Sequence, residues 1–151
     1  NFTHTWQLTN TRLARRGLPE QDLLDGGAGF GTGQFRHNVQ SRFGLWYKGT
    51  GSQLTVSWKG RSRIAAGTAS DPNDIVFRPF LKLDLSAFSD LGTVYPSAPL
   101  LKGTRVTLAV DNLLDGKQRV RDENGVTPLR YQPYLLDSLG RTVSLSLRKT
   151  Y

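Results

Sequence analysis

The chain has 151 residues, which suits one ordinary domain, and it contains no cysteine. The lack of cysteine excludes disulfides, thiolate metal sites and cysteine nucleophiles. Lys and Arg number 20 against 12 acidic residues, a formal net charge of +8 that is typical of proteins meeting nucleic acid, anionic lipid or an anionic small ligand. No run of about 18 apolar residues occurs, which excludes a transmembrane helix but leaves membrane-spanning strands open, because in those only alternate residues face lipid.

Short runs of alternating apolar and polar residues fill the chain, and no window shows the apolar spacing of an amphipathic helix. Each run has about 8–12 residues, the length that a tilted strand needs to cross a bilayer. In one of them Val106, Leu108 and Val110 share a parity. The sequence therefore predicts an all-β fold, an antiparallel meander of about six amphipathic strands. In chain order the predicted strands are residues 2–9, 39–47, 52–63, 80–87, 104–111 and 142–147.

The connections between these strands also follow a pattern. A tight turn at 48–51 and a Pro- and Gly-rich segment at 89–103 join strands at one end. The segments 12–38, 65–75 and 113–141 join them at the other. We expect longer loops at one rim and shorter connections at the other, as in outer-membrane barrels, where loops face outward and turns face the periplasm. The first strand would then run outward and the last would end inside.

Aromatic residues gather near the proposed inner rim: Phe2, Trp46, Tyr47, Phe88 and Tyr151. Aromatic girdles are expected at membrane interfaces, because the rings prefer the headgroup region. The alternative interpretation of the same pattern is a soluble β-sandwich whose aromatic residues form the core.

The C-terminal segment, residues 100–151, carries a more specific signal. Asn112-Leu113-Leu114-Asp115 follows the fifth predicted strand, and Gly140-Arg141 precedes the sixth, which ends in an aromatic residue. In order and spacing these elements resemble the C-terminal end of TonB-dependent outer-membrane receptors. In that family an Asn-Leu-Phe/Leu-Asp element closes the penultimate strand, and the last strand begins at Gly-Arg and ends in Phe or Tyr. The strand pattern of residues 1–99 fits the family without being specific to it.

The resemblance implies that residues 1–151 are the C-terminal part of a transmembrane β-barrel of about 22 strands in the bacterial outer membrane, with an N-terminal plug in the lumen. It implies active uptake of a scarce nutrient, such as a ferric siderophore, cobalamin or a glycan, driven by the TonB energy-transducing complex. The sequence contains neither the plug nor the energy-coupling segment. We therefore expect a fragment whose partners are outer-membrane lipid, the plug and the remaining strands of the parent chain.

The last predicted strand has a second expected role. The resemblance implies that its apolar residues and its terminal aromatic form the signal that the outer-membrane assembly machinery reads. Such recognition would use an exposed strand edge, with alternate side chains giving specificity. The residues of this signal are Val143, Leu145, Leu147 and Tyr151.

Seven basic residues have the polar parity: Arg42, Lys59, Arg61, Arg63, Lys82, Arg105 and Arg148. A charge facing lipid would cost about 2–4 kcal/mol at the membrane midplane, which explains this parity. The seven form either a basic lumen wall that attracts an anionic substrate or acidic plug residues, or a solvated face whose charges pair with other strands. Because aromatic residues lie mostly on the opposite parity, we expect no nucleic-acid binding.

No catalytic, metal or cofactor site is expected, and the chain is not predicted to be an enzyme. His4 and His37 are far apart in the sequence, and no spacing suggests zinc ligands. The Gly-rich stretch 26–33 does not match a phosphate loop, and 71–74 departs from a calcium loop. Two alternatives to the receptor stay open. One is a complete small barrel with an adhesin or structural role, which would need about eight strands, and the other is a soluble basic β-domain that binds a polyanion.

Overall fold

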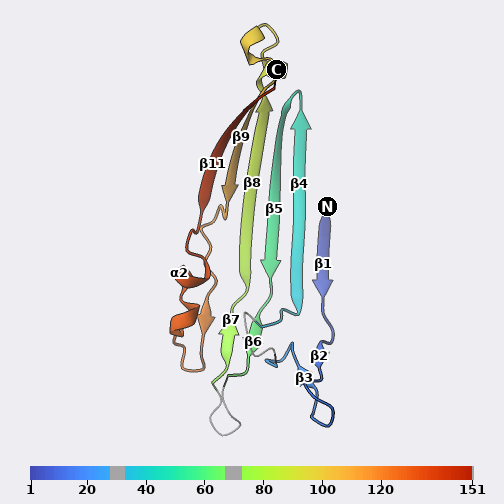
Figure 1. Cartoon of the computed structure of the whole chain (residues 1–151), viewed down its shortest axis with the longest axis vertical. Helices are drawn as coiled ribbons and strands as arrows, with labels where there is room; N and C mark the ends of the chain where they lie inside the picture. The colour runs from blue at the N-terminus through green and yellow to red at the C-terminus, as the bar shows by residue number, and fades with distance from the viewer. Residues whose placement is uncertain (28–32, 67–72, 151) are drawn as a thin grey trace.

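The computed structural model describes residues 1–27, 33–66 and 73–150. Tyr151, most of the Gly-rich stretch and half of the 71–74 segment lie outside the described residues. Six strands form one antiparallel sheet, the large sheet, in the order β1-β4-β5-β8-β9-β11 (Figure 1). They are β1 (Phe2–Trp6), β4 (His37–Tyr47), β5 (Thr50–Lys59), β8 (Phe80–Asp90), β9 (Thr104–Asp111) and β11 (Thr142–Lys149). The predicted all-β fold and the antiparallel pairing of the six strands are confirmed.

The register of the large sheet sorts the side chains into two faces. Residues directly opposite each other on paired strands point to the same side of a sheet. Leu85 of β8 lies opposite both Leu54 of β5 and Val110 of β9. Val110 in turn lies opposite Val143 of β11. The apolar parities of the separate runs therefore meet on one side, the apolar face, and the polar parities meet on the other, the polar face.

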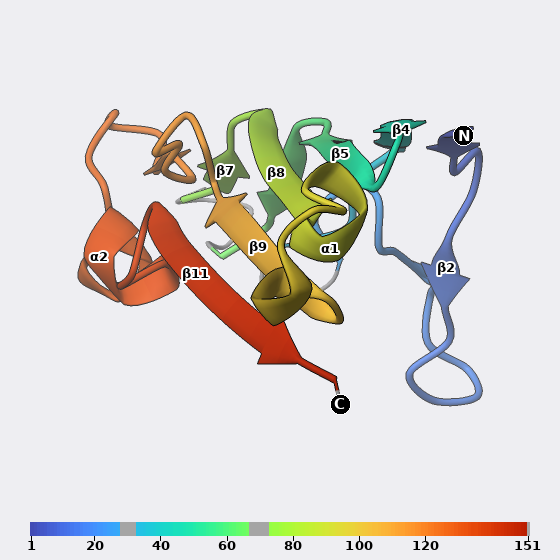
Figure 2. The ribbon, with the colours of Figure 1, turned by 90° about the horizontal axis from the view of Figure 1, so that it is seen from above.

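The apolar face lies open in the described part of the chain. Leu45, Leu145 and Leu147 are 78%, 74% and 72% exposed, so no second sheet or helix among the described residues covers them. This arrangement differs from a β-sandwich, in which such side chains would fill a core. Seen from above, the strands follow an open curve from β1 to β11 (Figure 2). These two strands are the edges of the sheet.

The two ends of the large sheet differ in their connections. One end, the turn end, carries the Lys48–Gly49 turn and the β8–β9 connection with α1 (Leu91–Val94) and η1 (Pro99–Leu101) (Figure 1). Lys48 and Gly49 have φ angles of 41° and 81°, the positive values that a two-residue hairpin turn requires. No helix in the described residues is long and apolar enough to cross a membrane.

The opposite end, the loop end, holds a small sheet and a small core. Its strands are β6 (Ser62–Ile64), β7 (Ile75–Phe77) and β10 (Val120–Arg121), in the order β10-β7-β6. Ile64, Phe77 and Val120 pack with Tyr131, whose ring meets Phe77 edge-on at 5.2 Å between centroids. The same end carries β2 (Thr11–Arg12), β3 (Gln21–Asp22), η2 (Leu129–Tyr131) and α2 (Pro133–Leu136).

Two expectations about strand placement are wrong. The predicted strand 52–63 is two strands, because the chain leaves the large sheet after Lys59 and β6 joins the small sheet. The backbone N–H of Gly60 donates the last ladder hydrogen bond to the carbonyl of His37, at 2.8 Å. Phe2 does not lie at the inner rim, because it pairs with Ser41, halfway along β4.

Candidate functional site

The polar face gathers most of the basic residues that the sequence singled out. Lys82 lies opposite Ser57, and Arg105 lies opposite both Asp90 and Arg148. The seven residues divide by position: Arg42, Lys59, Lys82, Arg105 and Arg148 belong to the polar face, whereas Arg61 and Arg63 lie beyond β5 at the loop end. A continuous row of seven charges along one sheet is therefore absent.

Several of these charges have acidic partners nearby. Lys82 Nζ lies 3.1 Å from a carboxylate oxygen of Asp84. Arg63 lies 2.9 Å from carboxylate oxygens of both Asp25 and Asp74. These pairs are partly exposed and contribute little to stability, because water screens them. Their effect is to neutralise part of the basic surface.

The strongest pair lies at the turn end. Arg105 donates from Nε to Asp90 Oδ1 at 2.6 Å and from Nη2 to Asp90 Oδ2 at 2.8 Å, a two-pronged contact. The Arg105 guanidinium also lies over the ring of Phe88, 4.5 Å from its centroid, which favours a cation–π interaction.

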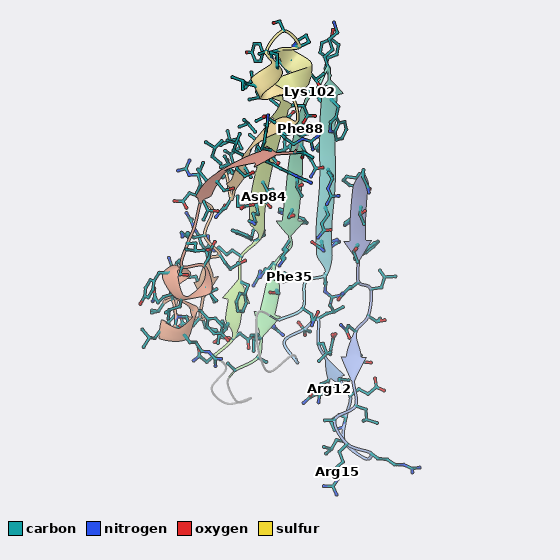
Figure 3. All side chains as sticks on the ribbon, turned by 45° about the horizontal axis from the view of Figure 1, so that its top comes forward. Arg12, Arg15, Phe35, Asp84, Phe88 and Lys102 are labelled. Carbon is teal, nitrogen blue, oxygen red and sulfur yellow. The ribbon has the colours of Figure 1, made fainter. Side chains whose placement is uncertain are left out.

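Aromatic rings extend this pair along the polar face. A Cβ at Gly51 would lie 2.5 Å from Trp46 Cδ1 and 2.6 Å from Phe88 Cε1, so both rings occupy the space that a side chain would need. The indole also covers Gly44. Glycine in a strand leaves room for such rings, and the rings shield the backbone in return. Lys102, Phe88 and Asp84 follow one another from the turn end towards the middle of the sheet (Figure 3).

Trp46 and Phe88 are exceptions to the expectation that aromatic and basic residues lie mostly on opposite faces, which holds for Phe43, Tyr47 and Trp58 of the neighbouring strands. Both residues have even numbers in strands whose apolar residues are odd. The alternation therefore places both side chains on the polar face, although we expected them in an aromatic girdle at the membrane interface. Tyr47, by contrast, lies on the apolar face at the turn end, opposite Thr50.

The Asn112-Leu113-Leu114-Asp115 element ends β9 and holds the start of β11. The side chain of Asn112 is buried, accepts from the Gly116 N–H at 2.9 Å and donates to the Gly116 carbonyl at 3.0 Å. Asp115 Oδ1 accepts from the backbone N–H of Arg141 at 3.0 Å. The guanidinium of Arg141 reaches the Leu113 carbonyl at 3.4 Å. The two segments of the C-terminal resemblance, far apart in the sequence, are hydrogen-bonded to each other.

The two histidines also come together. His4 Nε2 lies 3.3 Å from His37 Nδ1, and Trp6 stacks on His37 with ring centroids 5.7 Å apart. The register of β1 and β4 makes this contact, which the sequence spacing could not reveal. Among the described residues no third His, Cys, Asp or Glu joins them to form a metal-binding group.

The proposed assembly signal maps onto an edge strand. Val143, Leu145 and Leu147 alternate along β11 on the apolar face, and all three are exposed. β11 pairs only with β9, so its other edge is unpaired within the described residues. Tyr151, the terminal aromatic of the signal, lies outside the described residues.

The fold and its faces define a class: an antiparallel β protein built on an open, two-faced sheet. No protein-family model, curated protein or solved structure matches this chain.

Proposed function

We propose that this chain is the C-terminal part of a TonB-dependent receptor, a β-barrel of the bacterial outer membrane that takes up a scarce nutrient. The observation that carries the proposal is the exposed apolar face of a six-stranded sheet whose opposite face is polar. In water such a face would drive aggregation, whereas in a bilayer it is the surface that contacts lipid.

The distribution of charge supports lipid contact. Among the described residues in the strands of the large sheet, one charged residue, Lys149, points to the apolar face. It lies at the turn end, and its ammonium donates to the carbonyls of Leu100 and Lys102 at 2.7 Å. All other charges of these strands point to the polar face. Since a charge facing lipid costs about 2–4 kcal/mol at the midplane, this segregation is what a membrane sheet requires.

The dimensions of the strands support the same proposal. β4 and β8 have 11 residues and β5 has 10. A strand tilted by about 45° crosses the hydrocarbon layer in about 9–11 residues. The turn end would face the periplasm, and the loop end, with its small sheet and core, would face outward.

The unpaired edges indicate which partners the sheet needs. Closure around a packed lumen takes about eight strands, and a lumen that holds a plug takes about 22. In the proposed parent protein β1 and β11 would pair with further strands, the polar face would line the lumen against the plug, and TonB would supply energy. The assembly machinery would bind the β11 edge. The resemblance suggests a ferric siderophore, cobalamin or a glycan as the transported nutrient.

The proposal is tested on the full-length protein in its bacterial host. We expect the protein in the outer-membrane fraction with heat-modifiable electrophoretic mobility. We expect the wild-type strain to take up one such nutrient while the inner membrane is energised, and a deletion strain to lose this uptake. A monodisperse monomer in plain buffer, with a cooperative thermal transition, would instead support the soluble basic β-domain. Outer-membrane location without any uptake defect would support the adhesin or structural barrel.

A further inference from the structure

A cavity opens on the polar face at the turn end of the sheet, next to the Asp90–Arg105 pair. Its volume is about 520 Å³, which falls among the volumes of small-molecule pockets, about 300–1,000 Å³. It lies where three segments meet: the end of β8 with α1, the start of β9, and the end of β11. Its lining includes Asp90, Thr93, Lys102, Arg105, Arg148 and Thr150.

The segments that line this cavity, the rim cavity, are joined to one another by hydrogen bonds. The Thr150 N–H donates to the Gly103 carbonyl at 2.9 Å, which joins the end of β11 to the start of β9. The ammonium of Lys149 donates to the carbonyls of Leu100 and Lys102, both at 2.7 Å, which fixes the η1 segment. These hydrogen bonds fix the backbone of the segments that carry Lys102 and Thr150.

The charges around the rim cavity are unbalanced. Three cationic side chains, those of Lys102, Arg105 and Arg148, face one carboxylate, that of Asp90. Arg105 and Arg148 are direct cross-strand partners, and like charges in that position repel. Asp90 neutralises Arg105 through its two hydrogen bonds, and the side chains of Lys102 and Arg148 have no acidic partner among the described residues.

We propose that the rim cavity binds an oxyanion, a phosphate or carboxylate group carried by a small molecule. The guanidinium of Arg148 supplies a fork of N–H donors that matches two oxygens of such a group. Lys102 supplies a second positive charge from the facing segment, and the anion relieves the repulsion between the two cross-strand arginines. Asp90 keeps Arg105 turned towards Phe88, which leaves Arg148 and Lys102 as the main binding groups. The site does not depend on what covers the apolar face.

The test is calorimetric titration of the purified full-length protein with inorganic phosphate and, separately, with succinate. We expect at least one of the two to bind. Arg148→Gln and Lys102→Gln should each weaken that binding by about tenfold or more, the loss expected for one charge-assisted hydrogen bond. The anion that binds shows whether the site takes a phosphate or a carboxylate group, since the two differ in charge and geometry.

Lys59→Gln is the matched control, because Lys59 lies on the same polar face at the loop end, far along β5 from the cavity. It removes the same charge, so it measures the general electrostatic contribution. Absence of binding by both anions would overturn the proposal, and so would equal weakening by Lys59→Gln. Lys102 lies outside the strands, so Lys102→Gln should leave the sheet intact. It still tests anion binding if Arg148→Gln fails to assemble. Binding can be measured whether the protein is recovered from membranes or from buffer, which separates this result from the membrane proposal.

Discussion

Replacing Leu108 of β9 by arginine is expected to prevent membrane assembly, whereas replacing its neighbour Thr107 is expected to be tolerated. Leu108 lies on the apolar face, opposite Ala87 and Leu145. Thr107 lies on the polar face, opposite Phe88. The two positions are adjacent in one strand, so they share the same depth and the same ladder. They differ in the face to which the side chain points.

The size of the effect follows from the surroundings of each side chain. Leu108 is 43% exposed, so in water an arginine there would keep its head group hydrated and change stability by about 0.5 kcal/mol or less. In a bilayer the same substitution would cost about 2–4 kcal/mol near the midplane. That cost corresponds to about 30-fold to several hundred-fold in the folding equilibrium. At Thr107 the new guanidinium would extend over the Phe88 ring on the polar face.

The assay is the amount of heat-modifiable full-length protein in isolated outer membranes, followed by urea unfolding in lipid vesicles. We expect Leu108→Arg to be depleted and destabilised and Thr107→Arg to approach wild type. Equal tolerance of both substitutions would refute the assignment of the apolar face to lipid. Equal loss of both would show that β9 accepts no added bulk on either side, and the assignment would fail in that case as well.

Three further outcomes are expected. Asn112→Gly keeps the positive φ of 52° accessible but removes both side-chain bonds to Gly116, so urea unfolding should show a loss of about 1–3 kcal/mol. Arg105→Gln removes the two-pronged contact with Asp90 and the cation–π contact with Phe88, so urea unfolding should show a lower midpoint. Gly51→Ala should displace the Trp46 indole and shift its fluorescence, since a Cβ would lie 2.5 Å from Cδ1.

Each outcome has a clear contrary result. An Asn112→Gly variant as stable as wild type would mean that Asn112 does not hold the turn. An unchanged unfolding midpoint in Arg105→Gln would mean that the contact with Asp90 does not stabilise the sheet. Fluorescence unaffected by Gly51→Ala, but changed by Ser52→Ala on the opposite face, would contradict the position of the indole over the glycine.

The six strands could be predicted because a two-faced sheet leaves a period of two in the sequence, and each strand shows it independently of its partners. The same property explains the error at residues 52–63. The alternation continues past Gly60 and Arg61, because β6 is also a strand. Alternation alone does not show which sheet a strand joins. The glycine at position 60, where pairing with β4 ends, is a local sign of the break in the sequence.

The height of a residue along the sheet could not be predicted. It depends on register, and alternation determines the face to which a residue points but not which residues of β1 and β4 pair. Phe2 therefore had the expected face but not the expected end of the sheet. The contact of His4 with His37 was missed for the same reason. The Asp90–Arg105 pair also requires the β8–β9 register, because the two residues are joined by a long connection.

The clamp between the two C-terminal motifs explains how the last strand keeps its register. β11 has one neighbour in the described residues, and a shift by a single residue would turn Val143, Leu145 and Leu147 to the polar face. Residues 116–140 separate the motifs, so β9 and β11 are not held by a short turn. Asp115 solves this by binding the N–H of Arg141, one residue before β11 begins. Gly140 supports the contact, because its φ of 64° is reached easily by glycine, and a Cβ there would lie 2.6 Å from Asp115 Oδ1. The polar motif thus fixes the orientation of the apolar side chains on the strand that follows it.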